Sequence, residues 1–169
     1  MHLIIDGYNL LHVIRSLTGL NSIELQWERD RLVDQLSSYR QLKGCEITVV
    51  FDGWQGGWNT EKREMRKGIE MVFSKLGEKA DEVIKRLAKQ KGAGAIVVTS
   101  DREVSRYAER MAVPVVSSDR FKERMAISSV KVQKGVEQDE REERGLKRKG
   151  PSRMLSKKVR RVQAALKKL

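Results

Sequence analysis

The sequence predicts an α/β fold with a central, mostly parallel β-sheet flanked by helices. Short apolar runs alternate with stretches of helical periodicity along most of the chain. Three of the apolar runs are followed by an aspartate, and in two of these cases a glycine comes directly after it. With 169 residues, of which 39% are hydrophobic, the chain has the size and apolar content of one domain with a short appendage.

The expected strands are short runs rich in valine, isoleucine and leucine. In chain order they cover residues 3–5, 47–51, 69–73, 95–99 and 113–116. Pro114 favours an edge position for the last of them, because proline cannot donate a hydrogen bond to a neighbouring strand.

The expected helices lie between these strands, and one more follows the last strand. Leu25, Leu32, Leu36 and Tyr39 recur at helical spacing, which predicts a helix over residues 24–42, and Gly44 follows as a stop signal. Further helices are expected over residues 79–91, 102–111 and 119–125. Strands that alternate with helices in this way typically pair in parallel.

The C-terminal part of the chain differs from the rest in composition. We expect residues 1–126 to form the domain, residues 127–150 a charged linker, and residues 151–169 a basic amphipathic helix. Residues 144–169 hold eleven of the 35 lysines and arginines and no acid, which leaves 24 basic and 23 acidic residues before them. Such a distribution is typical of a phosphate-binding extension on a nearly neutral domain. Alternatively, the helix packs its apolar stripe on the domain and leaves a solvated basic face.

Cysteine usage and the N-terminal stretch bear on location. Cys45 is the only cysteine, which excludes a disulfide within this chain and a zinc cage built of thiolates. A reducing compartment, the cytoplasm, is therefore expected. The apolar N-terminal stretch has no basic leader and is interrupted by Asp6 and Gly7, so we expect neither a signal peptide nor a membrane span.

Candidate catalytic residues follow the expected strands. Asp6, Asp52 and Asp101 each come just after a strand, and Asp81 lies at a helix start. The carboxyl ends of parallel strands open into one crevice, where clustered carboxylates repel one another unless a cation lies between them. Their oxygens suit Mg²⁺ or Mn²⁺, ions that activate water against a phosphodiester. Taken singly, each aspartate is equally well explained as a turn residue or a helix cap.

Other residues near these aspartates have two interpretations each. Asn9 is a candidate for holding water or phosphate, or it caps the helix after the first strand. Ser100 is a candidate phosphate donor, or it caps the next helix. Trp54 and Trp58 lie in a glycine-rich loop and suit stacking on bases, which contributes ~1–3 kcal/mol per base, but packing of the loop explains them equally well.

The stretches IIDGYNLL, VVFDG, KADEVI and VVTSDREV occur in this order. Together they resemble the motifs of NYN domains, above all those of the YacP-like branch, over about residues 1–125. The resemblance implies a PIN-like three-layer fold and a metal-dependent endoribonuclease, for some members acting at the ribosome. Carried over by motif, it implies a site that contains Asp6, Asn9, Asp52, Asp81 and Asp101. It also implies that Asp6, Asp81 and Asp101 bind Mg²⁺ or Mn²⁺.

The expected partner is RNA. The residues expected to contact it lie beside the predicted site and in the basic arm, and they are Ser100, Arg102, Trp54, Trp58, Arg148, Lys149, Arg153, Lys157, Lys158, Arg160 and Arg161. A non-catalytic RNA-binding or ribosome-binding module is the main alternative. A phospho-acceptor signalling domain also places Asp and Ser at strand ends. The preference for RNA over DNA comes from the resemblance alone, and the oligomeric state stays open.

Overall fold

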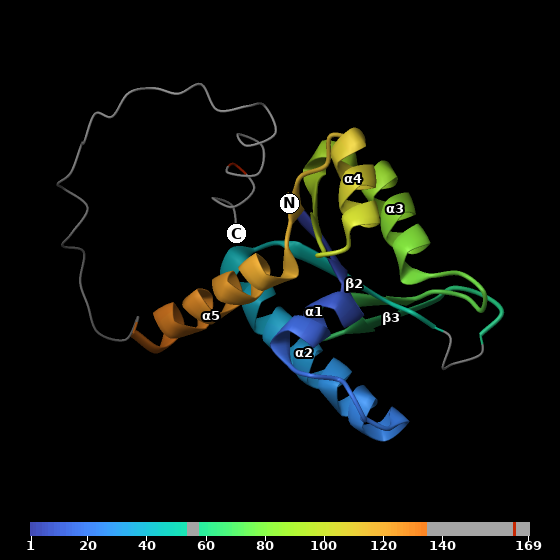
Figure 1. The fold of residues 1–169 in the computed structure, drawn as a ribbon. Coiled ribbons are helices and arrows are strands. Elements are labelled where there is room, and N and C mark those ends of the chain that lie inside the picture. The colour runs from blue at the N-terminus through green and yellow to red at the C-terminus, as the bar shows by residue number, and fades with distance from the viewer. Residues whose placement is uncertain (54–57, 135–163, 165–169) are drawn as a thin grey trace.

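A six-stranded sheet forms the centre of the part of the chain that the computed structural model describes, residues 1–53, 58–134 and 164 (Figure 1). The strands are β1 (His2–Asp6), β2 (Glu46–Phe51), β3 (Lys62–Arg66), β4 (Ile69–Phe73), β5 (Ala95–Val98) and β6 (Val115–Val116). The helices are α1 (Gly7–Ile14), α2 (Ser22–Lys43), α3 (Ala80–Lys91), α4 (Arg102–Arg110) and α5 (Ser118–Lys134), with a 3-10 turn η1 (Gly92–Gly94).

The sheet is mostly parallel, as predicted. Its strand order is β3-β4-β2-β1-β5-β6, and only the β3–β4 pair is antiparallel. Strand β6 lies at one edge, which confirms the position that Pro114 indicated. Strand β1 lies between β2 and β5, so the three strands that precede the predicted aspartates are direct neighbours.

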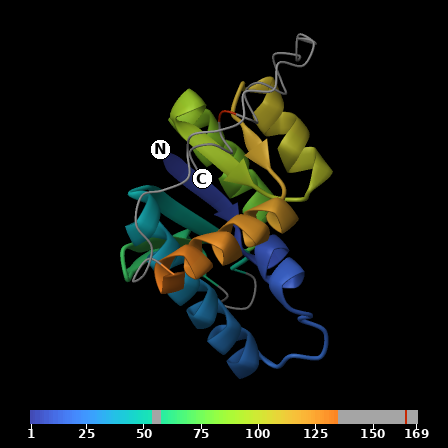
Figure 2. The ribbon, with the colours of Figure 1, turned by 90° about the vertical axis from the view of Figure 1, so that its left-hand side faces the viewer.

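Helices cover both faces of the sheet and give three layers (Figures 1 and 2). Side chains of a strand alternate between the faces, so Leu3 and Ile5 of β1 pack in one core and Ile4 in the other. The first core includes buried residues of α1, α2 and α5, and the second includes those of α3 and α4. This is the three-layer arrangement that the resemblance implied.

Strand β3 is absent from the sequence-based prediction. Its sequence, KREMR, is charged and has no apolar alternation, and its residues are exposed or half-buried. It becomes a strand because Lys67 and Gly68, with φ of 51° and 79°, form a tight turn that pairs it with β4. Charged side chains suit an edge strand because they discourage pairing with other chains.

Helix α2 has clear signals at both ends. Its N-cap is Asn21, whose side chain accepts hydrogen bonds from the backbone of Ile23 and Glu24, while the Glu24 carboxylate accepts one from the Asn21 backbone. The helix thus begins two residues before the predicted start. It ends at Gly44 in the left-handed conformation, as predicted.

Helix α5 corrects the expected boundary at residue 126. We expected a helix over residues 119–125 and then a linker, but α5 continues without interruption to Lys134. No glycine or proline interrupts residues 119–134, so the turns of the helix can follow one another. The rest of the expected linker lies outside the described residues, as does the expected C-terminal helix except for Ala164, so the domain limits stay a prediction.

Candidate active site

The carboxyl edge of the sheet brings the predicted aspartates together. Asp6 ends β1, Asp52 follows β2 directly, and Asp101 follows β5 after two residues. Asp81 lies in the first turn of α3, which covers one face of the same strands. Helices α1, α3 and α4 all begin at this edge, so the positive ends of their dipoles lie beside the aspartates. The arrangement offers carboxylates for a cation and helix ends for an anion.

Asp6 is the most buried of these aspartates, with 8% of its surface exposed. Its Oδ1 accepts a hydrogen bond from the Asn9 backbone (3.1 Å), which caps α1, and its Oδ2 accepts one from Thr99 Oγ1 (3.1 Å). Burial raises the pKa of Asp6 to about 6; the hydrogen bonds from Asn9 and Thr99 lower it, and the charges of Asp81 and Asp52 raise it. Ionisation of Asp6 therefore costs more free energy in the protein than in water.

Asp52 and Asp101 act as helix caps at the same edge. Oδ1 of Asp52 accepts a hydrogen bond from the Ala80 backbone at the start of α3 (2.7 Å). Oδ1 of Asp101 accepts hydrogen bonds from the backbone of Glu103 (2.7 Å) and Val104 (2.9 Å) in α4. Both aspartates are therefore helix caps, as the alternative interpretation expected, and both also lie at the edge where the candidate site is. Among the described residues, none donates a hydrogen bond to Oδ2 of either aspartate.

Asp81, in the first turn of α3, is half-buried. Burial raises its pKa, and the charges of Asp101 and Asp52 raise it further, while Lys85 lowers it. The Lys85 ammonium group binds Glu82 (2.8 Å) and lies 2.5 Å from the Glu103 carboxylate. Asp81 therefore stands in a field of negative charge that this lysine offsets in part.

These residues can be tested as ligands of a metal ion by how closely their carboxylates gather. Among residues 1–53 and 58–134, no group of three or more His, Cys, Asp or Glu side chains lies close enough to hold a metal ion directly. The implied set of Asp6, Asp81 and Asp101 is therefore not assembled as a compact cage; these residues lie at the end of β1, in the first turn of α3 and at the start of α4. Mg²⁺, however, usually keeps several waters and needs only one or two carboxylates together with phosphate oxygens. Burial is the main cause of the raised pKa of Asp6 and of Asp81, and neighbouring carboxylates add to it; a bound cation would offset the charge of those carboxylates.

A hydrogen-bond network joins Asn9 to distant parts of the chain. Its Oδ1 accepts hydrogen bonds from the Ser100 backbone (2.9 Å) and from Ser118 Oγ (2.7 Å). Ser100 Oγ in turn accepts one from the Ser118 backbone at the start of α5 (3.2 Å). Neither side chain is the cap of its helix, because Asp6 caps α1 and Asp101 caps α4. Asn9 and Ser100 instead hold α1, the end of β5 and α5 in place around the aspartates.

Thr99 and Ser118 are functional candidates that the sequence analysis missed. Thr99 Oγ1 donates to Asp6 and accepts from the Asp101 backbone (3.0 Å), so one buried hydroxyl links two aspartates. Its place in the stretch VVTSD was the available signal. Ser118 lies 109 residues from Asn9 and gave no such signal.

The expected RNA contacts are described only in part. Ser100 and Arg102 are exposed at the carboxyl edge. The Trp58 ring packs edge-on against Phe73 at 5.4 Å, and the Lys62 ammonium group lies 4.5 Å from its centre, so the packing interpretation has support. The remaining expected contacts lie outside the described residues, and they are Trp54, Arg148, Lys149, Arg153, Lys157, Lys158, Arg160 and Arg161.

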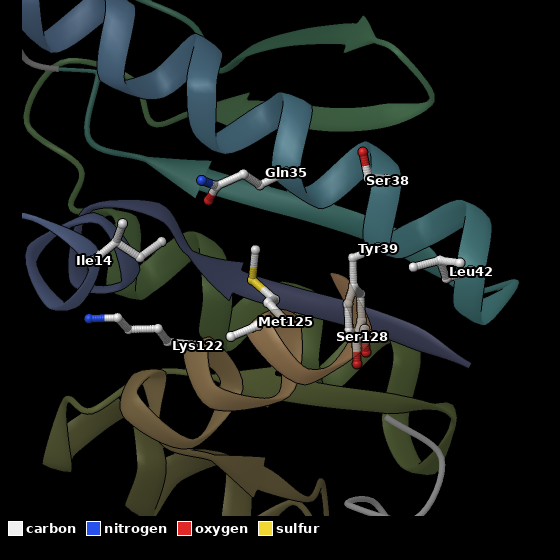
Figure 3. Close-up of a pocket in the computed structure, with 9 residues that line it drawn as sticks. Ile14, Gln35, Ser38, Tyr39, Leu42, Lys122, Met125 and Ser128 are labelled. Carbon is white, nitrogen blue, oxygen red and sulfur yellow. The ribbon is translucent and has the colours of Figure 1, made fainter. Parts of the chain in front are cut away.

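A cavity of about 300 Å³ lies away from the aspartates, between α1, α2 and α5 (Figure 3). Ile14, Tyr39, Leu42, Lys122 and Met125 contribute to its walls. None of the lining residues is acidic, so this cavity offers no carboxylate to a cation. The carboxyl edge remains the candidate for chemistry.

Comparison with known proteins agrees with the fold. In the described part of the chain, no helix is long and apolar enough to cross a membrane. The protein named uncharacterized protein YacP of Bacillus subtilis (strain 168) is 32% identical over 114 residues, which cover 66% of this chain and 64% of that protein. Two crystal structures of Rae1 (YacP) from Bacillus subtilis, one of them of a mutant, superpose with TM-scores of 0.67 and 0.64. Their sequences are 23% and 24% identical to this one. Each superposition includes 80% of this chain, and it includes 80% of the first and 79% of the second crystallised chain.

The family match extends beyond the motifs at the sheet edge. The sequence model of the YacP-like NYN domain matches residues 3–167. The basic C-terminal arm, which we expected to lie outside the resemblance, is thus included in the match. Because this match spans nearly the whole sequence and the fold agrees with that of Rae1 (YacP), the chain belongs to the YacP-like NYN domain family.

Proposed function

We propose that the protein is a metal-dependent endoribonuclease that hydrolyses RNA phosphodiesters at the carboxyl edge of its sheet. The observation that carries the proposal is the convergence of Asp6, Asp52, Asp81 and Asp101 on one edge, where burial, and to a smaller degree the neighbouring carboxylates, raise the pKa of Asp6 and of Asp81. Three helix N-termini at the same edge favour the approach of a phosphate. Family membership supports a nuclease fold and, by resemblance, RNA as the substrate.

The roles of the residues follow from their contacts. A bound Mg²⁺ or Mn²⁺ would supply an activated water and stabilise the charge on the leaving oxygen. Asp6, Asp81 and Asp101 would hold it, and Asp52 fixes the start of α3, from which Asp81 projects. Thr99 and Asn9 hold Asp6 in one orientation through the hydrogen bonds on its two oxygens. Asn9 also fixes the Ser100 backbone next to Asp101.

Cleavage of labelled oligonucleotides tests the proposal. With Mg²⁺ or Mn²⁺ we expect the protein to cut RNA, and we expect a chelator to stop the reaction. Asp81→Asn should lower kcat/KM by about 100-fold or more, because it removes a carboxylate from the site. Asp34→Asn is the matched control, since Asp34 is an exposed carboxylate of α2 that pairs with Lys67. Cleavage of DNA but not RNA would contradict the substrate, and cleavage that survives the chelator would contradict the role of the metal.

A non-catalytic RNA-binding or ribosome-binding module is the second candidate. It is favoured by one observation, that Asp6, Asp52 and Asp101 accept hydrogen bonds from helix starts and that the described residues form no compact metal cage. The same panel separates the two functions. Salt-sensitive RNA binding without any cleavage, in either metal, is the outcome that favours the binding module.

The basic arm is proposed to bind RNA, or RNA of the ribosome, through phosphate contacts. Replacing Lys157, Lys158, Arg160 and Arg161 by glutamine should weaken RNA binding and reduce its dependence on salt. Each lost contact to a single strand lowers the log-log slope by ~0.7, so a reduction of up to about 3 is expected. Fluorescence anisotropy over a range of KCl concentrations measures it. An unchanged slope would support the interpretation of the arm as a helix with a solvated basic face.

A further inference from the structure

Arg29 of α2 places a half-buried guanidinium group against the carboxyl ends of β2 and β4. Its Cζ lies 6.0 Å from the centre of the Phe51 ring and 5.7 Å from that of Phe73. Phe51 directly precedes Asp52. Phe73, at the carboxyl end of the neighbouring strand β4, is the residue that pairs with Phe51. Arg29 therefore lies at the carboxyl edge, on the face of the sheet that α2 covers.

This guanidinium group has no acidic partner in the described part of the chain. No Asp or Glu carboxylate among residues 1–53 and 58–134 lies within 4.0 Å of Arg29. The acids on either side of it in α2 are engaged elsewhere, since Glu28 pairs with Arg15 and Asp30 pairs with Arg66. A cation that is partly removed from water and is not neutralised is suited to bind an anion.

The hydrogen bonds of Arg29 leave donor capacity unused. Its Nη2 donates to Gln26 Oε1 (2.7 Å), and its Nη1 makes a long contact with Tyr8 Oη (3.4 Å). Its Nε is buried and has no partner among the described residues, which is uncommon for a buried polar atom. The partners of Arg29 among the described residues are neutral, so they do not compensate its charge.

Tyr8 connects this group to the aspartates. It lies two residues after Asp6, and its ring packs edge-on against Phe51 at 5.3 Å. Its hydroxyl lies 3.4 Å from Nη1 of Arg29, so the phenol and the guanidinium group lie side by side over the end of β2. A tyrosine hydroxyl both donates and accepts, and it can serve a phosphate oxygen together with an arginine.

We propose that Arg29, with the Tyr8 hydroxyl, binds a backbone phosphate of the RNA next to the one that is cleaved. The inference rests on the proposed function and makes Arg29 and Tyr8 positioning residues for that reaction. The planar guanidinium fork matches the geometry of a phosphate, and two flanking phenyl rings restrict its orientation. The scissile phosphate then lies over the aspartates, and its neighbour along the strand lies over Arg29.

RNA binding without cleavage tests this assignment. The parent is the full-length Asp6→Asn variant, and the probe is a fluorescein-labelled single-stranded RNA measured by anisotropy over a range of KCl concentrations. Adding Arg29→Met should weaken binding by about tenfold, the effect of one charged hydrogen bond. It should also lower the salt slope by ~0.7, because one phosphate contact is lost. Arg29→Lys should restore the slope but only part of the affinity, since lysine keeps the charge and not the fork.

Controls separate this contact from general charge and from folding. Arg110→Met removes a positive charge at the last residue of α4, at the opposite end of that helix from Asp101, and should change neither quantity. Tyr8→Phe removes only the hydroxyl and should weaken binding by a smaller factor than Arg29→Met. In the cleaving protein, Arg29→Met should raise KM by about tenfold and leave kcat within about threefold, as expected for a flanking contact.

The outcomes distinguish this inference from the proposed function. A folded Arg29→Met variant with the affinity and slope of its parent overturns the phosphate contact and leaves the guanidinium as a packing group. A parent that does not bind RNA at all overturns both proposals. Binding that depends on Arg29 in a protein that never cleaves RNA supports the contact and contradicts the nuclease. An acidic peptide that competes with RNA only when Arg29 is present would replace the phosphate by a protein partner.

Discussion

Asp6→Asn is expected to abolish RNA cleavage and, at neutral pH, to stabilise the protein in the absence of metal. Asp6 is buried, and its pKa is raised to about 6, chiefly by burial. Asparagine has nearly the same shape and carries no charge, and its oxygen can still accept the hydrogen bond from the Asn9 backbone. The substitution therefore removes a destabilising charge together with the carboxylate that the proposed reaction needs.

The size of this stabilisation depends on pH. Because the folded-state pKa of Asp6 lies above its ordinary value of 3.8, the folded protein binds more protons than the unfolded chain between about pH 4 and pH 6. The stability that the folded protein gains from keeping this carboxyl protonated is fully present below about pH 4 and is lost as pH rises through 6. At pH 8 the ionised group costs about 3 kcal/mol, since each unit of pKa shift corresponds to about 1.4 kcal/mol.

Urea unfolding with a chelator at pH 4 and at pH 8 measures the effect. We expect Asp6→Asn to raise the free energy of unfolding by about 1–3 kcal/mol at pH 8 and to change it little at pH 4. The lower end of this range applies if the asparagine amide loses the hydrogen bond that Thr99 Oγ1 donates to Asp6. Asp34→Asn, at an exposed position, should show no such pH dependence. Mg²⁺ should stabilise the wild type more than Asp6→Asn. A variant that is less stable than the wild type at pH 8 would show that Asp6 is stabilising in its charged form.

Gly53→Ala is expected to destabilise the protein by about 3 kcal/mol or more and to impair cleavage. A Cβ atom at residue 53 would lie 1.8 Å from the carbonyl oxygen of Ser74. That oxygen belongs to the backbone, and Ser74 is held by two hydrogen bonds, one from its N to Phe51 O (3.0 Å) and one to its Oγ from Gly53 N (3.0 Å). Relief of the clash must therefore separate the ends of β2 and β4 and displace Asp52.

Thermal and urea unfolding measure this loss, and Gly94→Ala is the matched control. At Gly94 no atom lies within 4 Å of an added Cβ, and its φ is not in the left-handed range, so a change within about 0.5 kcal/mol is expected. Wild-type stability of Gly53→Ala would mean that the two strand ends are not held as closely as these contacts indicate. A stable variant that has lost activity would instead assign the effect to the position of Asp52.

The Asp-Gly pairs show how sequence and structure complement each other. The sequence indicated that Asp6-Gly7 and Asp52-Gly53 end two strands, and it placed both aspartates at one edge. The reason for the glycines is tertiary, because an added Cβ at Gly7 would lie 2.3 Å from the Phe51 ring and one at Gly53 would meet Ser74. Phe51 and Gly7 belong to different elements, as do Ser74 and Gly53, so no local periodicity in the sequence reveals either contact.

Elements that are stabilised by distant contacts were the ones missed or misjudged. Strand β3 forms through pairing with β4, although its own residues favour no buried strand. Arg29 gave no signal within a helix of mixed charge, and its neighbours Phe51 and Phe73 are more than twenty residues away. Capping of α3 by Asp52 spans 28 residues, where a local cap at Lys79 would have been the usual solution.

The sequence by itself determined the α/β class, the five apolar strands, the long helix that ends at Gly44, and the edge at which the aspartates lie. These features depend on periodicity and on local start and stop signals, which are encoded within a few residues. Only the tertiary structure decided the strand order, the pairing of β3, the burial that raises the pKa of Asp6, and the lack of an acidic partner for Arg29 among the described residues. Each of these depends on which residues meet across the sheet, and that is set by packing of the whole chain rather than by any local pattern.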